Sequence, residues 1–67
     1  MKITNDMTDG AALAELGRRL ARIRLDQNIT QAELAERSGV SKRTVERLES
    51  GAVGTQLSGF LRVCRAL

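Results

Sequence analysis

The segment Gln31–Ser50, QAELAERSGVSKRTVERLES, constrains the fold of this chain more than any other part of the sequence. Its apolar spacing predicts two short helices that meet at a tight turn at Gly39, where the missing Cβ permits a positive φ. Ala35 is small enough for the first helix to approach the second, and Val45 and Leu48 share one face of the second helix. The segment therefore predicts a two-helix unit with a tight corner.

Apolar residues ahead of this unit recur at helical spacing and predict a first helix over residues 9–27, capped by Thr8 or Asp9. Asn28 suits the left-handed position at which such a helix stops. Residues 1–8 show no sustained period and are expected to be an N-terminal lead-in. The apolar face of the first helix is expected to comprise Leu13, Leu16, Leu20 and Ile23.

Short polar residues are placed to cap the next two helices. Thr30 and Glu33 have the spacing of a capping box at the start of the second helix. Ser41 is suited to cap the third helix, which is expected to run to about Ser50 and to stop at Gly51.

A fourth helix is expected to start at Thr55 or Gln56, after a loop that contains glycines. Its core-facing side chains are expected to be Leu57, Phe60, Leu61, Cys64 and Leu67. Cys64 is thus interpreted as a small core hydrophobe. Because the chain has one cysteine and no histidine, we expect no disulfide, no metal, no cofactor and no enzymatic activity.

Length and charge limit the classes of protein to which this chain can belong. Sixty-seven residues make one small domain, which we expect to span residues 9–67. A net charge of +3 and an isoelectric point near 10.0 suit a polyanionic partner. The lone cysteine suits a reducing cytoplasm, and no apolar run is long enough to predict a membrane span. The sequence therefore predicts a cytoplasmic protein.

The stretch TQAELAERSGVSKRTVERLESG resembles the helix-turn-helix of the phage-repressor and Cro-like regulators, the XRE family. It carries the family's Gln31, the pair Leu34–Ala35, the turn Gly39 and the closing Glu49-x-Gly51, and the resemblance covers residues 13–67. It implies an all-α, compact four-helix repressor-type domain in which helices 2 and 3 form the helix-turn-helix.

Relatives usually continue into a fifth helix that helps to build the dimer. Because the given sequence ends at Leu67, we expect this chain to lack that helix and to dimerise weakly. Whether the natural chain is longer stays open.

The outward face of the third helix carries Lys42, Arg43 and Arg47 on a helical wheel. Arg and Lys donate to guanine O6 and N7 in the major groove, and the resemblance implies that these three residues reach base edges. The alternative is a solvated basic face, because arginine is also a good helix former. Glu46 either accepts from a cytosine amino group or pairs with Lys42 or Arg43, and we favour the pairing.

Gln31 lies at the start of the second helix, where free N–H groups and the helix dipole attract an anion. The resemblance implies that it holds a DNA phosphate, and Thr30 and Thr44 can also donate to phosphate oxygens. Arg24 and Glu49 lie on apolar stripes and are expected to form a partly buried ion pair, as in several relatives. The remaining arginines considered are expected to be solvated: Arg18, Arg19, Arg22 and Arg37.

The sequence therefore predicts a transcriptional regulator, of the repressor kind, that binds double-stranded DNA with its recognition helix, residues 41–50, in the major groove. The family implies a homodimer on a pseudo-palindromic operator. One alternative is an antitoxin that represses its own operon and masks a toxin protein. Another is a helical interaction module without DNA binding, against which the basic third helix argues.

Overall fold

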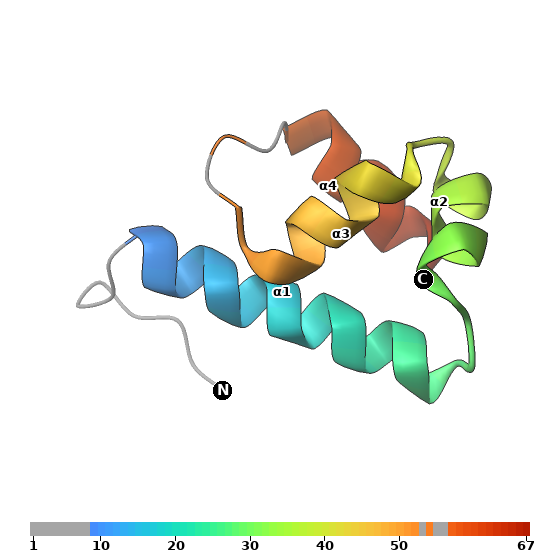
Figure 1. Ribbon diagram of the computed structural model, residues 1–67, viewed down its shortest axis with the longest axis horizontal. Coiled ribbons are helices and arrows are strands. Elements are labelled where there is room, and N and C mark those ends of the chain that lie inside the picture. The colour runs from blue at the N-terminus through green and yellow to red at the C-terminus, as the bar shows by residue number, and fades with distance from the viewer. Residues whose placement is uncertain (1–8, 53, 55–56) are drawn as a thin grey trace.

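The computed structural model describes residues 9–52, 54 and 57–67. Its elements are four helices: α1 (Asp9–Asp26), α2 (Gln31–Ser38), α3 (Lys42–Ser50) and α4 (Leu57–Ala66). The long α1 lies along one side of the molecule, α3 crosses above it, and the end of α4 lies beside α2 (Figure 1). The all-α, four-helix architecture is thus confirmed. No helix in this part of the chain is both long and apolar enough to cross a membrane.

Side-chain caps begin α2 and α3 where the sequence predicts them. The N–H of Glu33 donates to Thr30 Oγ1 at 3.0 Å, and the N–H of Thr30 donates to Glu33 Oε1 at 3.0 Å. The backbone bond from Thr30, assisted by its hydroxyl, lowers the pKa of the Glu33 carboxyl below its ordinary value. Ser41 Oγ accepts from the N–H of Thr44 at 3.1 Å, so both caps satisfy donors that a helix start leaves unpaired.

Left-handed residues end the first three helices. Asn28, just after α1, has a φ of 58°, and Gly39 and Gly51 have φ values of 72° and 75°. Beyond Gly39, the N–H of Val40 donates to the Ala35 carbonyl at 3.1 Å and closes the last turn of α2. The turn between α2 and α3 therefore follows from local backbone chemistry.

The core is a cluster of buried side chains from all four helices. Its buried members are Leu20, Leu34, Ala35, Val45, Leu48 and Val63. Leu34 and Val45 are fully buried, where α2 meets α3. Val40, Phe60, Ala66 and Leu67 pack against the cluster from the turn and from α4. The helix-turn-helix unit is therefore held between α1 and α4.

The predicted core face of α4 is wrong in part. Leu57 and Leu61 are 70% and 44% exposed and Cys64 is exposed, whereas Val63 is 1% exposed. Phe60 packs against the core as predicted. The apolar residues of α4 form two neighbouring stripes, and packing against α2 decides which stripe is buried. The predicted start of this helix at residues 55–56 lies outside the described residues.

One member of the predicted apolar face of α1 also differs. Ile23 is 44% exposed, whereas Leu20 is buried. The neighbouring α3 covers α1 near Gly17 and Leu20 and leaves Ile23 at the edge of the packed face.

Two glycines let α1 and α3 approach backbone to backbone. A Cβ built on Gly17 would lie 2.4 Å from the Glu49 carbonyl oxygen, and one on Gly51 would lie 2.5 Å from Ala14 Cα. No side chain fits between the two helices at this crossing, so the glycines determine how closely they pack. Gly17 carries no local signal in the sequence for this role, because the atoms that it approaches belong to a helix about thirty residues further along the chain.

We expect Gly17→Ala to lower the free energy of unfolding by about 1–3 kcal/mol, because the new methyl group must push α3 away. This loss opposes the gain in helix propensity of about 1 kcal/mol that alanine brings. Gly10→Ala on the same helix is the control, because no atom lies within 4 Å of its added Cβ. Urea unfolding of both variants checks the prediction, and an equal gain in stability for both would contradict the close crossing.

Candidate nucleic-acid interface

Helix α3 turns its basic side chains away from the core. Val45 and Leu48 are buried on its inner face, and Lys42, Arg43 and Arg47 are exposed on the other side. The inner face packs against α1, α2 and α4, which leaves the basic face accessible to a partner.

One of these cations has a nearby carboxylate. Lys42 Nζ lies 4.0 Å from Glu46 Oε1, one turn further along the helix, and both side chains are more than half exposed. This geometry agrees with the pairing that we favoured for Glu46, although an exposed pair at this distance contributes little stability. Arg43 and Arg47 have no carboxylate within 4 Å among the described residues. Their guanidinium groups are therefore available to an external acceptor.

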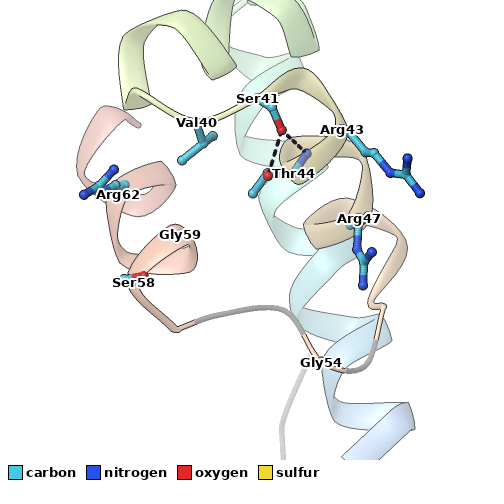
Figure 2. Close-up of a pocket in the computed structure, with 9 residues that line it drawn as sticks. All are labelled: Val40, Ser41, Arg43, Thr44, Arg47, Gly54, Ser58, Gly59 and Arg62. Atoms are coloured by element: carbon cyan, nitrogen blue, oxygen red, sulfur yellow. Dashed lines mark hydrogen bonds between the residues drawn. The ribbon is translucent and has the colours of Figure 1, made fainter.

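The two threonines considered as phosphate donors take part in helix caps. Thr30 Oγ1 accepts the cap bond of α2. Thr44 Oγ1 lies 2.9 Å from Ser41 Oγ, at the start of α3 (Figure 2). A hydroxyl has one donor and two acceptor positions, so a capping hydroxyl can still contact a ligand.

A partly buried ion pair joins α1 to the end of α3. Arg24 Nε donates to Glu49 Oε2 at 2.7 Å, and Arg24 Nη2 donates to Glu49 Oε1 at 3.2 Å. Arg24 Nη1 also donates to the carbonyl of Ile29 at 2.7 Å. The two side chains are 11% and 8% exposed. The structure thus brings together the two charges that the sequence places on apolar stripes.

Gln31 extends this network to the start of α2. Its Nε2 donates to Glu49 Oε1 at 3.0 Å, a bond that the sequence analysis did not anticipate. The bond holds the amide of Gln31 in one orientation beside the first turn of α2. A primary amide has a second N–H and a carbonyl oxygen, so Gln31 keeps a donor for an anion. Glu49 therefore positions the residue that we predicted to contact phosphate.

A depression of about 470 Å³ lies between α3 and α4 (Figure 2). Its lining residues are Val40, Ser41, Arg43, Thr44, Arg47, Gly54, Ser58, Gly59 and Arg62. Arg43 and Arg47 lie on the α3 side and Arg62 lies on the α4 side. Arg62 was not among the predicted site residues, because the predicted core face of α4 included Leu61 and Cys64 and not Val63. With Val63 facing the core, the preceding residue, Arg62, lies at the α4 edge of this depression.

The chain belongs to the helix-turn-helix domain family, whose model matches residues 15–67. The matched region holds most of α1 and all of α2, α3 and α4. A comparison with curated proteins gives no match. The class of the protein is therefore established by the family model and by the geometry of α2, the turn and α3.

We expect Arg24→Met to lower the free energy of unfolding by on the order of 3 kcal/mol, because Glu49 would stay buried without its cation. Arg24→Met/Glu49→Leu should recover much of this loss, since neither variant side chain is charged.

Arg22→Met is the matched control for this prediction. Arg22 pairs with Asp26 at 3.7 Å, but both side chains are largely exposed, so its loss should change stability by about 0.5 kcal/mol or less. Denaturant midpoints of the three variants give the comparison. A midpoint for Arg24→Met equal to that of the parent would mean that the buried pair contributes no stability.

Proposed function

We propose that this protein is a transcriptional regulator of the phage-repressor and Cro-like (XRE) type, which binds double-stranded DNA sequence-specifically and acts as a repressor. The observation that carries the proposal is the exposed pair Arg43 and Arg47 on the second helix of a helix-turn-helix domain. An exposed arginine on a helix of any protein is not by itself evidence for DNA binding. Arginines on the outer face of this particular helix suit base recognition, because the fold presents that helix to the major groove.

The proposed readout uses residues 41–50 in the major groove, which at about 12 Å wide admits an α-helix. Arg43 and Arg47 are separated by four residues, about one helical turn, so they would contact neighbouring base pairs. Each guanidinium can donate two hydrogen bonds to O6 and N7 of a guanine. Lys42 lies in the first turn and would leave its weak pair with Glu46 to reach a base edge.

Phosphate contacts would set the orientation of α3 in the groove. Gln31 supports this role because it is the first residue of α2 and its amide, which donates one hydrogen bond to Glu49, keeps a second N–H for a phosphate. Thr30 and Thr44 would add hydroxyl donors at the starts of α2 and α3. Such contacts carry no direct sequence information, and they determine which base pairs the arginines meet.

A homodimer on a pseudo-palindromic operator is part of the proposal. One recognition helix covers only a few base pairs, and two copies one helical turn apart multiply modest contacts into useful specificity. An antitoxin role would use the same DNA-binding surface to repress its own operon, so the DNA experiments below apply to it equally.

Arg47→Ala should weaken binding to the preferred site by about 1–3 kcal/mol and relax base choice at one position in each half-site. Arg43→Ala should act similarly at a neighbouring position. Gln31→Ala should weaken binding to all DNA sequences about equally, because a contact with phosphate carries no direct information about the base sequence. The measurement is affinity for an operator selected from a random DNA pool and for each of its single-base variants.

Circular dichroism of these variants serves as the control for folding. Arg43 and Arg47 are exposed, so their spectra should match that of the parent. If Arg47→Ala loses the same factor on every sequence, Arg47 contacts phosphate and the assignment of specificity is wrong.

The dimer can be tested with operator spacing. Insertion of about five base pairs between the half-sites should abolish cooperative binding, because it turns one half-site to the opposite face of the duplex. Each isolated half-site should keep its own weak affinity. Unchanged cooperative binding after the insertion would contradict a symmetric dimer on DNA.

A further inference from the structure

Most of the basic side chains that lie outside the ion pairs of the described residues line one part of the surface. In the described part of the chain, the basic residues with no carboxylate within 4 Å are Arg19, Arg37, Arg43, Arg47, Arg62 and Arg65. All of them except Arg19 line two depressions in the surface. The first is the depression between α3 and α4, and the second lies between the end of α2 and the end of α4.

Arg62 lines both depressions and so connects them. The second depression holds about 290 Å³ and is lined by Arg37, Ser38, Arg62, Arg65 and Ala66. No Asp or Glu lines either depression. We call Arg37, Arg62 and Arg65 the arginine band. The band continues from the basic face of α3 across α4 to the end of α2.

Several positive charges on one part of a surface create a positive potential that attracts a polyanion. We propose that the arginine band is a second DNA contact, along which the sugar–phosphate backbone beside the major groove lies. The proposal rests on the proposed function, because it extends the same DNA from α3. Arg62 would be the central phosphate ligand, and Arg37 and Arg65 would contact phosphates further along.

The arginine band adjoins the basic face of α3, so DNA is favoured over an acidic protein as the ligand of the band. Arg43 and Arg47 border the depression from α3 and Arg62 borders it from α4, with their side chains extending outward on the two sides (Figure 2). DNA that contacts α3 would reach Arg62 by lying across this depression. The hydroxyls of Ser41 and Ser58 in the lining can also donate to phosphate oxygens. A guanidinium group also matches the geometry of a phosphate, to which it can donate two parallel hydrogen bonds.

The test measures the salt dependence of DNA affinity for two variants of equal charge. One is Arg37→Ala/Arg62→Ala/Arg65→Ala, and the control is Arg18→Ala/Arg19→Ala/Arg22→Ala. The control residues lie on α1, line neither depression, and are exposed like those of the band. Each variant removes three positive charges, so a difference between them reports contact with DNA and not net charge. The probe is a duplex that the unaltered protein binds, titrated at about 50 and 200 mM salt.

We expect the band variant to lose about 0.9 from the slope of log affinity against log salt for each phosphate contact, or about 2.7 in all. The control variant should keep a slope close to that of the parent. Arg62→Ala alone should remove about 0.9 and should weaken binding to operator and random duplex by the same factor.

Equal slopes for the band variant and the control variant would overturn the proposal, and an acidic protein would then be the occupant to examine. This failure is distinct from failure of the proposed function, in which the unaltered protein would bind no duplex at either salt concentration. Circular dichroism spectra that match the parent would confirm that both variants fold.

Discussion

The bidentate ion pair between Arg24 and Glu49 is the interaction on which the geometry of the candidate site depends. It ties α1 to the last turn of α3, and Arg24 also donates to the carbonyl of Ile29, just ahead of α2. Two charges with side chains 11% and 8% exposed are costly unless their hydrogen bonds are satisfied. The described residues contain no buried side-chain nitrogen or oxygen without a partner. One network therefore sets the positions of three helices relative to one another.

The same network reaches the surface. Gln31 donates to Glu49, so the residue at the start of α2 shares an acceptor with the cation from α1. The close crossing at Gly17 keeps the α3 backbone against α1 and places Glu49 within reach of Arg24. A larger side chain at Gly17 would therefore alter the relative positions of α2 and α3. Structural stability and the proposed phosphate contact thus have a common origin.

Charge is distributed unevenly over the four helices. Two arginines of α1 lie beside acids of the same helix: Arg18 pairs with Glu15 and Arg22 pairs with Asp26. The arginines that border the two depressions have no carboxylate within 4 Å among the described residues, although Arg37 lies near enough to Glu33 to help lower the pKa of that carboxyl. A net charge of +3 alone is weak evidence for a polyanionic partner. Its concentration on one side of the domain is stronger evidence, because it lowers the free energy of association with an anion on that side.

The sequence by itself determined the boundaries of α2 and α3, because the signals that set them are local. The capping box of Thr30, the cap at Ser41 and the left-handed Gly39 each act over a few residues of chain, and all agree with the structure. It also determined the inner face of α3, since Val45 and Leu48 leave one apolar stripe on a strongly charged helix.

Tertiary structure alone decided the orientation of α4. Its two apolar stripes are nearly equivalent in sequence, and only contact with α2 and the core buries Val63 and exposes Leu61. That rotation places Arg62 beside the depression, which explains why sequence reasoning missed it. The bond from Gln31 to Glu49 and the close approach at Gly17 likewise join residues far apart in the chain. Helix periodicity describes one element at a time, so contacts between elements emerge only when the helices pack together.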